Sequence, residues 1–341
     1  MNFKKWASLT AATYALLAPL NLVHAADVTL RLAHPWPGNS DISKGLSAWA
    51  DSLTTASDGR IDVELYPAQT LSKAAKSYDA VISQIADVAA TVQGYTANRF
   101  LLTQVVELPG VVDTAAQGSC VLQQLYDEGD IKDEYQDTHV LFVWTNGPGH
   151  LHLKGKSVKK PEDMAGLRIR RPTTIVGQLL EELEAQPVGM PAPDTYQSLQ
   201  RGVIDGVAMS WDGVKVFRLN EVADHHTELN LYSLSFMLTM NKRVYESLPA
   251  DLQDIIDQHS GHKWSQFMAN IFDDLDRQSV QEVTAMKQTI THFNDEIKAA
   301  WKPVLDGVTA SYLSELENKG MPGRQVYNRA MKLSAGCNNK T

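Results

Sequence analysis

Hydrophobic and polar residues follow two periods along this chain, and segments of the two kinds alternate. Apolar residues spaced i, i+3, i+4 and i+7 before a glycine predict a helix: Leu46, Trp49, Ala50, Leu53 and Gly59. The predicted elements of the first 95 residues are a strand, this helix, a strand, a helical segment and a strand: 28–36, 46–59, 60–67, 73–87 and 88–95. Their β-α-β-α-β order indicates a parallel sheet flanked by helices.

The same alternation continues further along the chain. Strands are predicted over four segments and helices over two, namely 139–147, 166–172, 204–211 and 233–241, then 174–185 and 193–202. The helix-rich segment 248–289 has no proline after its second residue. As one helix of about 40 residues it would be about 60 Å long, so we expect a spine along two lobes. Residues 294–333 predict further helix, broken at Pro303 and around Gly320–Gly323.

The first 25 residues have the pattern of a Sec signal peptide. Lys4 and Lys5 precede a mostly apolar, uncharged run from Trp6 to Val23, and Ala25 ends a small-residue cleavage pattern. An uncleaved membrane anchor is the alternative, which Pro19 argues against. We therefore expect export to the periplasm, and no later run approaches the ~20 apolar residues that span a bilayer.

The remaining length predicts two lobes, because it exceeds what one hydrophobic core usually spans. We expect lobe I to comprise 26–147 with 235–274, lobe II to comprise 148–234 with 275–330, and 331–341 to form a tail. The predicted fold class is thus α/β, a two-lobed clamshell of the periplasmic binding protein type with a long spine helix. Such proteins bind small ligands in the cleft, at the carboxyl ends of parallel strands.

The charge balance argues against nucleic acid as a partner. The chain has 31 basic and 40 acidic side chains, and both lysines of the leader are lost on cleavage. The sequence contains none of the C-x-x-C, H-E-x-x-H, G-x-S-x-G or G-x-x-x-x-G-K motifs. We expect no cofactor and no catalytic centre.

Within this acidic chain, the segment Gly-Leu-Arg-Ile-Arg-Arg-Pro at 166–172 gathers three arginines in four positions. Strand periodicity puts Arg168 and Arg170 on the face opposite Leu167 and Ile169. Such a segment is either a solvated strand face or a clamp for a carboxylate, whose two oxygens match the planar guanidinium fork.

Three segments resemble the receptors of TRAP (tripartite ATP-independent periplasmic) transporters: KKPEDMAGLRIRRPTT, AQPVGMPAPDTYQSLQRGVIDGVAMS and LTMNKRVYESLPADLQDII. The resemblance extends from about residue 28 to about residue 320. It implies a solute receptor that binds an organic acid in its cleft and delivers it to a small and a large membrane subunit. In the family motif, the arginine two residues before the proline pairs with the ligand carboxylate, and here it is Arg170.

The sequence departs from the family pattern at three positions. His150 stands where many members have a second arginine, Met209 where many have an asparagine, and Ala192 where some have an aromatic residue. These changes remove a fixed charge and a polar group and enlarge one wall. The resemblance therefore implies a monocarboxylate with an apolar or aromatic tail, held by Arg170 and by a hydrogen bond from His150.

Other candidate ligand-binding residues follow predicted strands, where the cleft is expected. They are Trp36 and Asn39 after the first strand, Gln93 and Tyr95 at the end of the third, and Met209, Trp211 and Asp212 at the end of the strand 204–211. For each, a role in the lobe core or surface is the alternative. The histidine pairs His150–His152 and His225–His226 lack a third clustered ligand, so we expect no metal site.

Two alternatives remain open at this point. Cys120 and Cys337 either form a disulfide, pinning the C-terminal tail to a helix at 115–128, or are two separate thiols. A periplasmic ligand sensor for a signalling partner would use the same pocket as a transport receptor.

Overall fold

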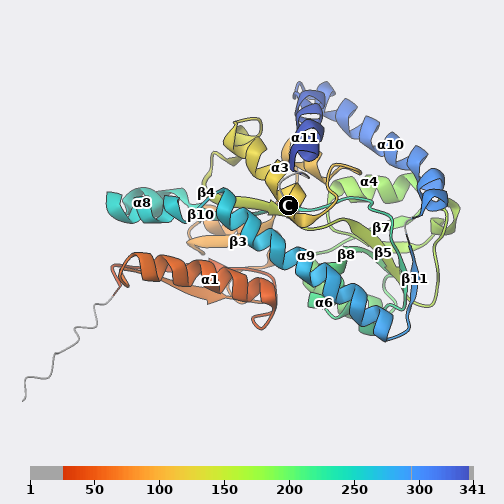
Figure 1. The fold of residues 1–341 in the computed structure, drawn as a ribbon, viewed down its shortest axis with the longest axis horizontal. Helices are drawn as coiled ribbons and strands as arrows, with labels where there is room; N and C mark the ends of the chain where they lie inside the picture. The colour runs from red at the N-terminus through yellow and green to blue at the C-terminus, as the bar shows by residue number, and fades with distance from the viewer. Residues whose placement is uncertain (1–25, 293, 338–341) are drawn as a thin grey trace, which may run out of the picture.

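The computed structural model describes residues 26–292 and 294–337, so the predicted leader lies outside the described residues. It contains two sheets, one for each lobe (Figure 1). The first has the order β2-β1-β3-β10-β4, formed by Ile61–Tyr66, Val28–Ala33, Val88–Val92, Ser235–Asn241 and Thr138–Thr145. The second has the order β11-β9-β5-β8-β6-β7, formed by Thr289–Thr291, His225–Thr227, Gly149–Leu153, Gly206–Ser210, Arg168–Arg171 and Gln186–Gly189.

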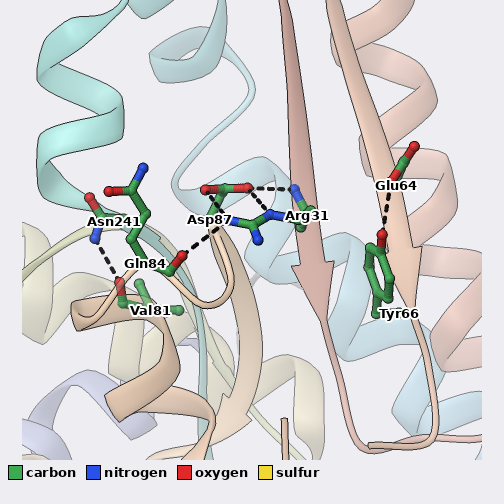
Figure 2. Close-up of polar contacts among 7 residues, drawn as sticks. All are labelled: Arg31, Glu64, Tyr66, Val81, Gln84, Asp87 and Asn241. Carbon is green, nitrogen blue, oxygen red and sulfur yellow. Dashed lines mark hydrogen bonds and ion pairs between the residues drawn. The ribbon is translucent and has the colours of Figure 1, made fainter. Parts of the chain in front are cut away.

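In the first sheet β1 runs parallel to β2 and β3, and β10 lies antiparallel between β3 and β4. A paired arginine fixes the contact between β1 and β3 (Figure 2). Arg31 donates from Nε to Oδ2 of Asp87 (2.8 Å) and from Nη2 to Oδ1 (3.1 Å). Asn241, at the end of β10, donates to the Val81 carbonyl (2.7 Å) and so attaches this strand to the helix Ser77–Ile82.

In the second sheet β6 runs parallel to both β7 and β8, while β5 runs antiparallel to β8 and β9. The predicted strands at 166–172 and 204–211 are the parallel pair β6 and β8. The short strands β5, β7, β9 and β11 were not predicted. The α/β character and the two lobes expected from the sequence are confirmed.

The helices cover both sheets (Figure 1). Those of the first part of the chain are α1 (Asp41–Ala56), α2 (Ser77–Ile82), α3 (Ala115–Asp127), α4 (Thr174–Glu182), α5 (Thr195–Gln200) and α6 (Trp211–Val216). Those of the last part are α7 (Lys242–Ser247), α8 (Ala250–Gln258), α9 (His262–Ala285), α10 (Asp295–Asn318) and α11 (Gly323–Cys337). The predicted apolar face of α1 is buried against the first sheet, with Leu46, Trp49 and Leu53 inaccessible.

The spine runs along both lobes, but it is shorter than predicted. Helix α9 packs on α1, α3 and β4 on the first side and on α6 on the second (Figure 1). The prediction of one helix over 248–289 is wrong, because Gly261 adopts a φ of +73° and separates α8 from α9. The 24 residues of α9 span about 36 Å.

The C-terminal region also differs in part from expectation. Helix α10 continues through Pro303, where we predicted a break, and the buried Trp301 and Val308 on either side of the proline hold it against the core. The break near Gly320 is present. Helix α11 follows this break and packs on α3. A disulfide joins Cys120 of α3 to Cys337 of α11, and residues 338–341 of the expected tail lie outside the described residues.

Candidate ligand-binding site

A small cavity lies between the two lobes, where strands of both sheets end. Trp36 follows β1, Tyr95 follows β3, Arg170 lies near the end of β6 and Asp212 follows β8. The space open to the centre of a water-sized sphere is about 30 Å³. The lining residues are Pro35, Trp36, Val92, Tyr95, Asn146, Arg170, Ala192, Pro193, Met209, Ser210, Asp212, Gly213, Phe217, Leu234 and Phe236. The position agrees with the general rule that α/β proteins bind ligands beyond the carboxyl ends of parallel strands.

The guanidinium of Arg170 is completely buried. Nε donates to the Met190 carbonyl (3.0 Å) and Nη1 to the Ala208 carbonyl (3.0 Å). Nη2 donates to the Tyr95 hydroxyl (3.4 Å). Among the described residues no carboxylate lies within ion-pair distance of this guanidinium. Nη1 also contacts the Met209 thioether (3.8 Å), and the bonds to protein oxygen leave one N–H of Nη2 for another acceptor. A buried cation held by neutral groups alone favours an anionic ligand, because an isolated buried charge is costly.

Tyr95 belongs to the other lobe and closes over this cation. Its hydroxyl accepts from Arg170 Nη2 and from the backbone N–H of Ala192 (3.0 Å). Two donors already point at the phenolic oxygen, so its own O–H is free to donate. Tyr95 and Arg170 together can offer hydrogen bonds from both lobes to one carboxylate.

The neighbouring arginine on the same strand has a different environment. Arg168 donates from Nε and Nη2 to the two oxygens of Asp205, at 3.0 and 2.7 Å. Its side chain is 41 % exposed, and it does not line the cavity. The strand periodicity placed both residues on one face, but only Arg170 lies deep enough to reach the cleft.

Aromatic rings form part of the cavity wall. The ring centroid of Trp36 lies 5.9 Å from that of Phe236 and 6.3 Å from that of Phe272. Phe236 stacks on Trp144, with a centroid distance of 5.5 Å and an interplanar angle of 12°. These contacts fix Trp36 and Phe236 in place, so the cavity combines rigid apolar walls with a few polar groups.

An acidic side chain also lines the cavity. Asp212 lies in the first turn of helix α6, and burial raises its pKa to about 7, although the Ser210 hydroxyl and the Asn146 amide favour the charged form. Its backbone N–H donates to the buried carboxyl of Asp276 on α9. Burial and the charge of Asp212 raise the pKa of Asp276 well above its usual range.

Four predicted site residues lie away from the cavity lining. Asn39 is exposed in the loop before α1. The Gln93 amide is buried between the Phe236 carbonyl (3.0 Å) and the Tyr135 hydroxyl (2.7 Å). Trp211 donates to Glu228 (3.2 Å), behind the β8 strand end.

The fourth is His150, whose ring is buried on β5. Its Nδ1 accepts from the backbone N–H groups of Leu229 (3.3 Å) and Asn230 (3.4 Å), and burial lowers its pKa to about 4. On the same strand, His152 contacts His226 through their Nδ1 atoms (2.8 Å). Among residues 26–292 and 294–337, no group of three or more His, Cys, Asp or Glu side chains is placed to hold a metal ion.

Several lining residues were not predicted. Asn146 begins the first crossing from lobe to lobe, and Leu234 and Phe236 lie where the second crossing enters β10. Because β10 is antiparallel, its first residues meet the carboxyl ends of the parallel strands. The strand at 233–241 was predicted from its apolar run, but its direction in the sheet was not. Without that direction, the sequence does not place Leu234 and Phe236 at the cavity.

A two-lobed fold closed over a buried, unpaired guanidinium defines a receptor for a small solute. Residues 32–315 match the bacterial extracellular solute-binding protein family 7, and the chain belongs to that family. Its structural relatives are TRAP solute-binding proteins. In the part of the chain that is described, no helix combines the length and apolar character needed to cross a membrane.

Three relatives illustrate the similarity. A TRAP solute-binding protein from Rhodoferax ferrireducens T118, in complex with copurified benzoate, is 33 % identical, with a TM-score of 0.87 over 92 % of this chain and 99 % of that chain. A marine metagenome protein specific for aromatic acid ligands, crystallised with 3-hydroxybenzoate, is 29 % identical, with the same TM-score and coverage. The C4-dicarboxylate-binding periplasmic protein DctP of Rhodobacter capsulatus is 24 % identical over 88 % of this chain and 90 % of its own length.

Proposed function

We propose that this protein is the exported receptor of a TRAP transporter and binds an aromatic monocarboxylate between its lobes. Arg170 pairs with the ligand carboxylate, Tyr95 donates a second hydrogen bond from the other lobe, and the closed complex delivers the acid to the two membrane subunits. The observation that carries this proposal is the fully buried Arg170 guanidinium, which has no carboxylate partner among the described residues.

The apolar walls support an aromatic ligand body. Trp36 and Phe236 are held by further rings, and Met209 and Leu234 add apolar surface. Two relatives of 29 to 33 % identity carry benzoate and 3-hydroxybenzoate. A ring with one carboxylate matches a cavity whose described lining offers the Arg170 guanidinium and rigid apolar walls.

The sequence of the leader supports the route of export. Residues 1–25 combine a basic start, an apolar run and a small-residue cleavage pattern, and we propose that cleavage after Ala25 releases the receptor into the periplasm. Mass measurement of the protein purified from the periplasmic fraction tests this. A mass that retains the leader would contradict it.

Calorimetric titration of the purified receptor with benzoate tests the proposed function, with benzamide as a control that keeps the ring but lacks the anionic carboxylate. We expect benzoate to bind and benzamide to bind at least thirtyfold more weakly, because the amide cannot form the ion pair. A thermal-shift screen extends the test to other ring acids, since a ligand at 100 times its Kd adds about 2.7 kcal/mol of stability. Equal affinity for benzoate and benzamide, or binding of aliphatic diacids alone, would overturn the proposal.

A further inference from the structure

The side chain of Asp212 presents an unused hydrogen-bond acceptor at the cavity. The residue lines the cavity and is only 4 % exposed. Its Oδ1 is buried and has no hydrogen-bond partner among the described residues. A buried acceptor without a donor is unfavourable, and such atoms are rare in folded proteins.

The polar neighbours of Asp212 hydrogen-bond to one another and to the backbone. Asn146 accepts at Oδ1 from the Leu234 backbone N–H (2.7 Å) and donates from Nδ2 to Ser210 Oγ (2.8 Å). These bonds tie the two crossing segments to the end of β8. The Ser210 hydroxyl and the Asn146 amide also favour the charged form of Asp212, yet its Oδ1 has no hydrogen-bond partner among the described residues. A molecule in the cavity can supply the missing donor.

We propose that Asp212 Oδ1 accepts a hydrogen bond from a hydroxyl group on the ring of the bound acid, so that the site selects hydroxylated aromatic monocarboxylates. This inference rests on the proposed function, because it requires the carboxylate of the same ligand to be held by Arg170. Arg170 then determines that the ligand is an acid, and Asp212 determines which substituted ring is preferred.

The chemistry of the oxygen explains why a hydroxyl group suits it. Oδ1 keeps a lone pair whether the carboxyl is charged or carries its proton on the other oxygen. A ring hydroxyl donates to it, whereas a hydrogen atom or a methoxy group leaves it unsatisfied. A second carboxylate on the ring would place acceptor against acceptor in a dry site and would be rejected.

Calorimetric titration with a matched series of acids tests the inference on the unmodified protein. The series comprises benzoate, the three hydroxybenzoates and the methoxybenzoate that corresponds to the tightest hydroxybenzoate. We expect at least one hydroxybenzoate to bind about ten- to a hundredfold more tightly than benzoate, as a hydrogen bond to a charged acceptor allows. We expect its methoxy counterpart to lose that gain.

The variant Asp212→Ala tests the residue itself. The ratio of hydroxybenzoate to benzoate affinity should fall to within threefold. Asp273→Asn is the matched control, because Asp273 belongs to the same acidic cluster but caps helix α3 and does not line the cavity. Its ratio should remain that of the wild type.

The outcomes separate the two proposals. If no aromatic acid binds, the proposed function fails. If benzoate binds but a hydroxyl adds no more than threefold at any position, or if Asp212→Ala keeps the wild-type ratio, the role of Asp212 is overturned while the receptor function stands. Should Asp212→Ala fail to fold, the methoxy comparison decides, since equal affinity of the hydroxy and methoxy acids also overturns the role.

Discussion

Arg31 and Arg170 lie on strands of the two different lobes, and their guanidinium groups have opposite environments. Arg31 grips both oxygens of Asp87 and so holds β1 beside β3 (Figure 2). Arg170 is more deeply buried, yet its protein partners are two carbonyls, a hydroxyl and a thioether. The difference indicates that the pair of Arg31 with Asp87 serves the fold, and it is the reason we propose that Arg170, held by neutral groups, pairs with a ligand.

The largest effect should come from removing the unpaired guanidinium. Arg170→Ala leaves the ligand carboxylate buried without a partner, which costs about 2 to 5 kcal/mol, or roughly thirtyfold to several thousandfold in affinity. Arg170→Lys keeps the charge but loses the fork, so it should also bind poorly. Titration calorimetry with benzoate on folded variants measures both effects. If Arg170→Ala bound benzoate with wild-type affinity, Arg170 would not be the ligand-binding cation, and its contrast with Arg31 would be lost.

The second effect concerns Asp212, whose carboxyl lines the same cavity as the Arg170 guanidinium. Burial raises its folded pKa from 3.8 to about 7. The unfolded chain therefore releases this proton first, and the stability that Asp212 contributes at acidic pH is lost as the pH rises from about 4 to 7. Relative to the wild type, ligand-free Asp212→Asn should gain up to about 1.4 kcal/mol per pH unit across this window.

Chemical denaturation of both proteins at several pH values gives this difference, and comparing them cancels the opposite contribution of the buried histidines. Burial lowers the pKa of His34 and of His150 to about 4, so each histidine favours folding increasingly as the pH rises from about 4 to 6.5. Parallel stability curves for the wild type and Asp212→Asn would show that Asp212 is ionised in the folded state.

A third, smaller effect should appear when the paired guanidinium is removed. Arg31→Ala should lower the free energy of unfolding by about 1 kcal/mol, because solvent screens a side chain that is 38 % exposed. The affinity for benzoate should stay within twofold, since Arg31 does not line the cavity. Urea denaturation and calorimetry measure the two quantities, and a large loss of affinity would mean that a structural pair also controls the cleft.

The smallest effect is expected at Arg168, two residues from Arg170 on the same strand. It pairs with Asp205 at the surface, so Arg168→Ala should change the affinity for benzoate by less than threefold. If Arg168→Ala abolished binding while Arg170→Ala did not, the ligand cation would be Arg168.

Local pattern was sufficient for much of the fold. The period-2 segment around 166–172 predicted a strand and placed Arg168 and Arg170 on one face, and the resemblance selected Arg170 between them. Helix α1 also follows from periodicity, because it buries its apolar face against the first sheet, and strands β1 to β3 lie within the predicted strand segments. These features depend on residues close together in the sequence.

The parts that were missed depend on contacts between distant segments. Phe236 lines the cavity because β10 runs antiparallel to β3, and nothing in its own apolar run reveals that direction. Gly261 ends one helix and begins another by adopting positive φ where its N–H reaches the Leu141 carbonyl (2.7 Å). The role of His150 stays a prediction, with its ring in contact with the backbone at 229–230.

The disulfide between Cys120 and Cys337 also restricts when the molecule can be completed. The two cysteines are separated by 217 residues, and the enclosed segment contains the whole second sheet and both strands through which the chain passes between lobes. Since a chain is synthesised from its N-terminus, Cys120 remains a free thiol until Cys337 has been made. The disulfide therefore forms only in chains that contain the whole enclosed segment, and a chain interrupted between the two cysteines would keep a reactive thiol.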